Sequence, residues 1–334
     1  MHEQKKAKHN IEISDLKNLV SEDLKIIDNL LYKILSDKSD LIQLVVKNIF
    51  NAGGKRIRPL LTILCGKLFN YEKEELYYLA SAVELIHTAT LLHDDVIDGS
   101  KLRRGRETAN YQHGNKTPIL VGDFLFAESF KYMVNSKSLE ALQTLAKASS
   151  IITQGEVKQL ELIKNKTFSF KLYLEVIQAK TAELFGAAAK SAAVVANRSA
   201  SEANILYEFA FNLGLAFQII DDILDYSLES KNLGKNIGDD FYEQKITLPV
   251  ILLYNNSSDN EKLELENIFN SEEATRDKLN YVLTELEHKD ILKQCFNYAK
   301  NHIDKALNLL NNFPECKSRE ILKNICHITI NRSF

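Results

Sequence analysis

The sequence predicts an all-α fold, and three observations support this prediction. Gly and Pro are scarce, with 12 and 4 in 334 residues, so the chain has few positions for tight turns. The segments between them carry apolar residues at helical spacing. No stretch rich in Pro, Gly and Ser divides the chain. We therefore expect a single all-α domain over residues 13–334, after a disordered N-terminus over residues 1–12.

Two kinds of helix are expected in order along the chain. Segments that are apolar on more than one face are typical of helices inside a bundle, and they span residues 41–50, 76–98 and 206–225. From Ser257 onward the pattern becomes amphipathic and rich in charge, which predicts helices with one solvated face. Composition predicts loops at residues 36–40, 165–169 and 227–240.

Composition and charge argue against several classes of function. The chain is 45% hydrophobic, which is ample for a large core, and its net charge of -3 gives no basic field for nucleic acid. Its four cysteines lack the spacing of a zinc site or a disulfide framework, as is typical of a reducing compartment. No apolar signal segment follows the basic N-terminus, and no segment has the composition of a membrane span. We expect a cytoplasmic protein without a nucleic-acid partner.

A short acidic pattern, Asp-Asp-x-x-Asp, occurs twice, each time at the end of an apolar segment. The two copies are Asp94, Asp95 and Asp98, and Asp221, Asp222 and Asp225. On a helix the first and last acids of a copy share one face, with Cβ atoms about 5–6 Å apart. Two ionised carboxylates at that distance repel by about 3 kcal/mol at an effective dielectric near 20. One copy alone is typical of a solvated acidic helix end, but two copies behind buried helices favour a shared cation site.

Mg2+ is the cation that fits this site best, because every candidate ligand is a carboxylate oxygen. In proteins it usually binds one or two carboxylates together with phosphate oxygens of a substrate. Basic residues that suit the other phosphate oxygens lie in "KLRRGR" and "GGKRIRP" and at Lys180, Lys235 and Lys245. Each of them alone is more often a solvated surface cation. Together they predict two phosphate groups, one held through metal and one by basic side chains.

With these motifs the sequence resembles the trans-polyprenyl diphosphate synthases. The matching segments, in family order, are "GGKRIRP", "HTATLLHDDVIDGSKLRRG", "VGDFLF", "AKTAELF", "FQIIDDILD" and "LGKNIGDDFYEQKITLP", between residues 50 and 250. The resemblance implies an isoprenoid synthase-like bundle, a single large one around a deep central cavity, assembled as a homodimer. It also implies two or three Mg2+ ions that join the aspartate motifs to an allylic diphosphate, which condenses with isopentenyl diphosphate.

The resemblance also implies roles for individual residues. The metal ligands are expected to be Asp94, Asp98 and Asp221, with Asp95, Asp222 and Asp225 as ligands or support. Isopentenyl diphosphate is expected at Lys55, Arg58, His87 and Arg104, and the allylic diphosphate at Arg103, Lys180, Thr181, Gln218, Lys235 and Lys245. Catalysis is expected to involve Asp94, Asp98, Arg103, Lys180 and Asp221. Ionisation needs fixed positive charge at the departing oxygens, which Arg103 and Lys180 supply directly and the aspartates supply through bound metal. We expect Arg103 and Arg104 to point about 100° apart on a helical segment.

Product length is expected to depend on the residues one turn before Asp94. Short-chain members of the family carry bulky aromatic residues there, whereas Ala89 and Thr90 are small. Each added isoprene unit buries apolar surface at about 25 cal/mol per Å2, so elongation continues until a side chain blocks it. We expect a long-chain product of the octaprenyl class, used for quinone side chains, with geranylgeranyl or a longer chain as alternatives. A peripheral membrane contact for product release is a further expectation.

Three positions depart from the family pattern. His113 replaces an aromatic residue, Pro118 a small residue, and Gln244 a glycine next to Lys245. Two other classes of protein stay open. The pair of His93 and Asp94 suits a metal phosphohydrolase, but that chemistry needs further histidines as ligands. A catalytically silent subunit of a heteromeric synthase is expected to lose acids or basic residues, whereas both aspartate motifs are complete here.

Overall fold

The computed structural model describes residues 19–52, 54, 56–227, 237–271 and 273–331. The expectations for residues 1–12, Lys55 and Lys235 lie outside the described residues. Within those ranges the prediction of an all-α fold is confirmed. The only sheet there is a hairpin of two-residue strands, β1 (Leu102–Arg103) and β2 (Arg106–Glu107).

The helices follow one another through short connections. The first half of the chain contains α2 (Ser21–Lys33), α3 (Asp40–Asn51), α4 (Ile57–Lys67), α5 (Glu74–Ile97), α6 (Ala109–His113), α7 (Lys116–Asn135) and α8 (Leu139–Asn165). The middle contains α9 (Phe170–Ile177), the π-helix η1 (Gln178–Ala182), α10 (Glu183–Val195), α11 (Ala200–Asp225) and α12 (Asp239–Tyr242). The last part contains α13 (Leu248–Asn255), α14 (Asp259–Asn270), α15 (Arg276–His288), α16 (Ile291–Leu310) and α17 (Lys317–Ile330).

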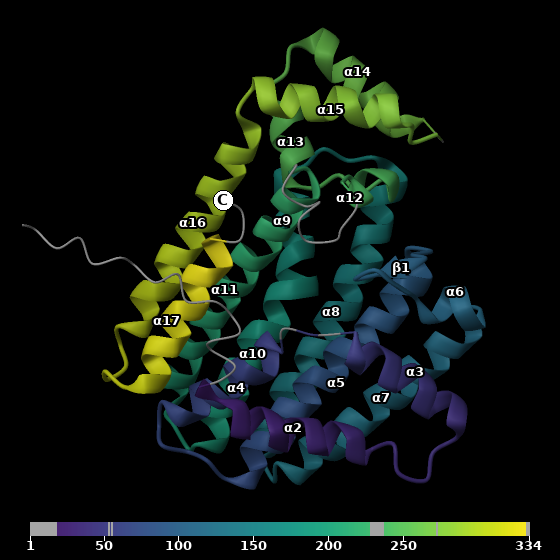
Figure 1. The fold of residues 1–334 in the computed structure, drawn as a ribbon. Helices are drawn as coiled ribbons and strands as arrows, with labels where there is room; N and C mark the ends of the chain where they lie inside the picture. The colour runs from purple at the N-terminus through teal and green to yellow at the C-terminus, as the bar shows by residue number, and fades with distance from the viewer. Residues whose placement is uncertain (1–18, 53, 55, 228–236, 272, 332–334) are drawn as a thin grey trace, which may run out of the picture.

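Helices α5 and α11, which end in the two aspartate motifs, are the long central helices of the bundle (Figure 1). Helix α5 packs mainly on α7 and α4, and α11 packs between α10 and α16. In the described part of the chain, α11 alone has the length and hydropathy of a membrane span. Because 56% of that window is buried inside the protein, α11 fits the description of a core helix.

One predicted inner helix is an outer one. Residues 41–50 are apolar on more than one face, and they were expected inside the bundle. In the structure α3 buries only one face, through Val45, Val46 and Phe50, while Leu41 and Leu44 are 46% and 47% exposed. The expectation was wrong because apolar composition does not determine which faces neighbouring helices cover.

Small residues allow α8, η1 and α11 to approach one another closely. A Cβ added at Gly155 of α8 would lie 2.7 Å from the Cβ of Ala179, and one at Gly214 of α11 would lie 2.8 Å from the Cα of Ala182. Both distances are shorter than real Cβ atoms tolerate. The π-helix that carries Lys180 and Thr181 is thus wedged between the two longer helices, and π-helical turns often occur at functional sites.

The helices after residue 257 are amphipathic, as their sequence predicts. Helix α14 begins with a capping box in which Ser258 and Glu261 satisfy each other's backbone N–H groups. Helices α14 and α15 project at one end of the molecule, and α16 and α17 cover α11 (Figure 1). This part of the chain supports the central helices and contributes none of the predicted site residues.

Candidate active site

One face of α5 keeps accessible surface within an otherwise buried helix. Between Leu79 and Leu92, α5 is buried except at His87, Thr90 and Leu91. Asp94 and Asp98 continue this face, since they follow at three- and four-residue spacing. The two outer acids of the first motif therefore lie on the side of α5 where a ligand can be held.

Lysines from two other segments meet these acids. The Lys245 ammonium lies 2.8 Å from Asp98 Oδ2 and 2.7 Å from Glu243 Oε2. Although burial opposes it, these carboxylates raise the pKa of Lys245 above its usual value. Burial raises the pKa of Asp94, while the nearby charge of Lys180 opposes that shift. Carboxylates and ammonium groups from α5, from η1 and from the segment after α12 thus converge at the first motif.

The middle acid of the second motif is held in a buried network. The Tyr173 hydroxyl donates to Asp222 Oδ2 at 2.6 Å, and Gln218 Nε2 donates to Asp222 Oδ1 at 2.8 Å. The hydroxyl of Thr181 donates to Gln218 Oε1 at 2.8 Å. Burial, with a smaller contribution from Asp240, raises the pKa of Asp222 well above its usual value. Asp222 therefore orients the predicted ligands Gln218 and Thr181.

The last acid of the second motif fixes the start of α12. Its two oxygens accept the backbone N–H groups of Asp239 at 3.1 Å and Asp240 at 3.0 Å. The backbone N–H of Lys245 in turn donates to the carbonyl of Asp240 at 2.8 Å. Asp225 thus fixes the short helix whose following segment carries Lys245 to Asp98.

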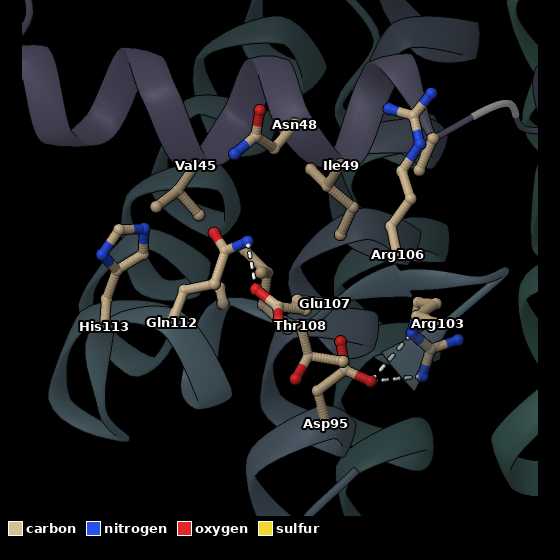
Figure 2. Close-up of a pocket in the computed structure, with 13 residues that line it drawn as sticks. Val45, Asn48, Ile49, Asp95, Arg103, Arg106, Glu107, Thr108, Gln112 and His113 are labelled. Carbon is tan, nitrogen blue, oxygen red and sulfur yellow. Dashed lines mark hydrogen bonds and ion pairs between the residues drawn. The ribbon is translucent and has the colours of Figure 1, made fainter. Parts of the chain in front are cut away.

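Asp95 has a comparable supporting partner in Arg103. The Nε and Nη2 atoms of Arg103 each lie 2.8 Å from Asp95 Oδ1 (Figure 2). Asp221, by contrast, is on the partly exposed face of α11, next to Gln218, and it interacts electrostatically with Arg58 and Arg104. The two motifs therefore divide alike: Asp94, Asp98 and Asp221 are on partly exposed faces, while Asp95, Asp222 and Asp225 are buried against protein donors.

Three residues of this region were missed in the sequence. Glu156 and Gln159 of α8 hold the Lys180 ammonium, at 2.7 Å and 2.6 Å. Burial, together with the charge of Asp94, raises the pKa of Glu156 to about 7. Tyr173, the donor to Asp222, is the third. Their spacing in "QGEVKQL" and "FKLYLEV" matches no motif, and their partners lie 21 to 49 residues away, so tertiary structure was needed to find them.

The predicted isopentenyl diphosphate site begins with Arg58 and His87. Nη1 of Arg58 donates to His87 Nε2 at 3.1 Å, and its guanidinium lies 4.7 Å from the ring centre of Phe185. Burial lowers the pKa of Arg58 to about 10, so the group stays charged at neutral pH. Burial and the charge of Arg58 lower the pKa of His87 well below its usual value. The imidazole is thus neutral and accepts the hydrogen bond.

Arg103 and Arg104 lie on a β-hairpin, so the expected helical segment there was wrong. Arg103 pairs with Arg106 in the hairpin, and the turn between them has positive φ at Arg104, 54°, and Gly105, 74°. Two-residue turns with both φ values positive are favoured in hairpins because they match the twist of the strands. Arg103 reaches back to Asp95. Arg104 lies near Gly54 instead, since a Cβ added at Gly54 would be 3.8 Å from Nη1 of Arg104. The two arginine side chains therefore have different neighbours, Asp95 for Arg103 and Gly54 for Arg104.

The expected chain-length residues differ in exposure. Thr90 is partly exposed on the Asp94 face, and its hydroxyl donates to the carbonyl of His87 at 2.8 Å. Ala89 is 1% exposed and packs in the core. Of the two, only Thr90 has accessible surface on the Asp94 face.

The three departures from the family pattern occupy separate places. His113 ends α6 and lines a cavity of about 350 Å3, which Asp95 and Arg103 border on the other side (Figure 2). Pro118 lies in the first turn of α7, where a proline removes no intrahelical hydrogen bond. Gln244 has a φ of 60°, in the left-handed region that favours glycine.

The carboxylates suit Mg2+ better than a metal that needs a complete protein cage. Among the described residues, no three His, Cys, Asp or Glu side chains gather closely enough to hold a metal by themselves. Mg2+ retains waters and takes substrate phosphate oxygens, so one or two carboxylates from each motif suffice. Asp94, Asp98 and Asp221, the acids predicted to hold metal, are partly exposed.

Comparison with known proteins gives one consistent result. Residues 39–286 match the model of the family described as polyprenyl synthetase. Octaprenyl diphosphate synthase of Haemophilus influenzae is 34% identical over 97% of this chain and 98% of its own length. A nonaprenyl diphosphate synthase of Rhodobacter capsulatus is 36% identical over 94% of this chain and 96% of its own length. The crystal structure of a polyprenyl synthase from Caulobacter crescentus, complexed with calcium and isoprenyl diphosphate, superposes with a TM-score of 0.93 at 38% identity, covering 98% of this chain and 100% of that one.

Proposed function

The chain belongs to the polyprenyl synthetase family, and on this premise we propose that it condenses isopentenyl diphosphate with an allylic diphosphate into a long-chain all-trans polyprenyl diphosphate. It is an enzyme, a prenyltransferase of isoprenoid biosynthesis. One observation carries the proposal for the site. Lys245 contacts Asp98 of the first motif and follows the helix that Asp225 of the second motif fixes. Both motifs thus border the same site, as the binding of one diphosphate between them requires.

Asp94, Asp98 and Asp221 are the residues that we propose to hold Mg2+, as two or three ions. When bound, Mg2+ supplies positive charge that stabilises the departing diphosphate. The other acids of the motifs serve as supports, because they are buried and their oxygens accept hydrogen bonds from protein groups. Asp95 holds Arg103, Asp222 holds Gln218, and Asp225 holds α12.

Basic side chains complete the binding of the two substrates in this proposal. Arg103, Lys180 and Lys245 face the allylic diphosphate, with Thr181, Gln218 and Lys235 as further contacts. Arg58, His87 and Arg104, with Lys55, hold isopentenyl diphosphate without metal. Such fixed positive charge is most effective where charge develops in the transition state, at the departing oxygens.

The reaction breaks one bond and forms one. The allylic C–O bond breaks, and diphosphate leaves with the electron pair. The double bond of isopentenyl diphosphate then supplies the electrons of the new C–C bond, and the released diphosphate accepts the proton that is lost. Leu91, partly exposed on the face of α5 just before Asp94, is an apolar side chain that helps to keep water away from the allylic cation.

For the product we propose the octaprenyl class, used for quinone side chains. Thr90 is small and partly exposed on the face that the growing chain follows, so it offers no obstacle. Similar relatives make octaprenyl and nonaprenyl diphosphates, which supports a long chain. A geranylgeranyl product is the alternative.

We propose a homodimer that forms through α7 and α8. Large apolar side chains are exposed on these two helices, among them Ile119, Leu120, Val134, Val157 and Leu160. Leu120 and Val134 are 67% and 61% exposed, which is unusual for a face without a partner. The same proposal places the enzyme in the cytoplasm, with residues 13–334 as one domain and a peripheral membrane contact for product release.

Incubation of the purified chain with Mg2+, isopentenyl diphosphate and farnesyl diphosphate tests the function. The proposal predicts release of diphosphate together with elongated prenyl products. Release of inorganic phosphate would instead identify a phosphohydrolase, and absence of any reaction would identify a silent subunit. Either result overturns the proposal.

A further inference from the structure

Gln244, directly before Lys245, has its backbone in the conformation that glycine favours, with φ 60°. A residue with a Cβ is strained in this region, so something must stabilise it there. The backbone N–H of Gln244 donates to the carbonyl of Phe241 at 3.0 Å, which closes the turn after α12. The side chain provides a second, long-range contact.

That contact joins the segment after α12 to the end of α8. Nζ of Lys166 donates to Gln244 Oε1 at 2.9 Å, across 78 residues of sequence. The orientation of the amide is unambiguous, since an ammonium group only donates and the amide oxygen only accepts. Lys166 is the C-cap of α8 and also has positive φ, 47°. Two residues with positive φ are therefore tied to each other, one at the end of α8 and the other just after α12.

Both segments joined by this contact also carry residues of the proposed active site. Lys245 follows Gln244 directly and reaches Asp98 at 2.8 Å. The α8 helix that Lys166 ends also carries Glu156 and Gln159, which hold Lys180. Helix α8 thus connects to two of the lysines proposed for the allylic diphosphate, Lys180 through Glu156 and Gln159 and Lys245 through Gln244.

We propose that the Lys166–Gln244 pair is a positioning latch that sets the segment after α12 so that Lys245 points at Asp98 and the allylic diphosphate. The hydrogen bond between Lys166 and Gln244 restricts the backbone next to Lys245, so Lys245 is held in place before substrate binds. If the Lys245 ammonium is already in place, the protein does not have to reorganise during the reaction, and this is the advantage that the latch would provide. This inference rests on the proposed function for the role of Lys245, but the latch itself is a structural statement.

The test uses Gln244→Gly, Lys166→Met and the double variant. We expect each single change to raise the KM for farnesyl diphosphate about three- to tenfold, while the KM for isopentenyl diphosphate stays within about twofold, because one hydrogen bond to a charged group is lost. The double variant should be no worse than the worse single variant, because both changes break the same contact. Lys166→Arg keeps a donor and should restore most of the loss.

Gln244→Gly separates positioning from general stability. Glycine relieves the strain at φ 60°, so this variant should unfold at the same or a higher temperature than the wild type while it binds the allylic substrate less well. Asn197→Gly, at a remote residue with φ 54°, and Lys164→Met, at an exposed lysine of α8, are matched controls that should leave both KM values unchanged.

Amide hydrogen exchange of residues 239–247 provides a readout that does not depend on activity. Exchange should be faster in Gln244→Gly and Lys166→Met and unchanged in Lys164→Met. A wild-type chain without prenyltransferase activity would overturn the proposed function yet leave this exchange result interpretable. Unchanged exchange, or single-variant effects on the KM that multiply in the double variant, would overturn the latch.

Discussion

Tyr173→Phe is expected to weaken both the fold and the use of the allylic substrate. The lost hydroxyl lies 2.6 Å from Asp222 Oδ2, and the two residues are 5% and 3% exposed, so no water replaces it easily. Loss of the donor leaves a buried carboxyl oxygen without this partner, which costs about 1–3 kcal/mol, and that is the expected loss in the free energy of unfolding. Because Asp222 also orients Gln218, the KM for farnesyl diphosphate should rise several-fold.

Chemical denaturation and steady-state kinetics check these expectations. Tyr207→Phe is a matched control, since the Tyr207 hydroxyl donates to Glu183 at 2.7 Å between α11 and α10, away from the aspartate motifs. The control is expected to leave both KM values unchanged. If Tyr173→Phe unfolds at the wild-type denaturant concentration and uses farnesyl diphosphate normally, Asp222 is not held as we describe.

Three further outcomes follow from the structure. Thr90→Phe should shorten the longest product seen by chromatography, because Thr90 is partly exposed on the face of α5 below Asp94, and an unchanged product would refute the open path. Arg104→Ala should chiefly raise the KM for isopentenyl diphosphate and Arg103→Ala that for the allylic substrate, and the reverse would show that the sites are exchanged. Burial lowers the pKa of His302 to about 4, so below pH 6.5 the unfolded chain binds a proton that the folded protein does not. The free energy of unfolding of the wild type should therefore fall by about 1–2 kcal/mol from this group as the pH drops from 6.5 to 4, after allowance for solvent exposure. His302→Gln should remove that part of the slope in denaturation curves measured across this range.

Sequence patterns were sufficient for the positions of the aspartate motifs. Their spacing placed Asp94 and Asp98 on one face of a helix, and the apolar segments before them predicted burial, which the structure bears out for α5 and α11. Patterns of this kind work because they are local properties of a helix.

Other features depended on contacts that no local pattern contains. Apolar composition alone did not reveal that α3 has an uncovered face, because coverage depends on the neighbouring helices. Glu156 and Tyr173 contact Lys180 and Asp222 only after the chain has folded. Gly105 is a turn signal next to Arg104, but Arg103 and Arg104 were expected on a helical segment, and the structure has a hairpin turn there.

We propose that both aspartate motifs hold one and the same diphosphate. Calorimetric binding of a non-reactive thio analogue of farnesyl diphosphate, with and without Mg2+, tests it in the wild type, Asp94→Ala, Asp221→Ala and the double variant. We predict that each single change weakens Mg2+-dependent binding at least about tenfold and that the double variant is little worse than either, since residues of one site are not additive. Effects that multiply, as for two independent sites, or binding that ignores both changes, would contradict the account.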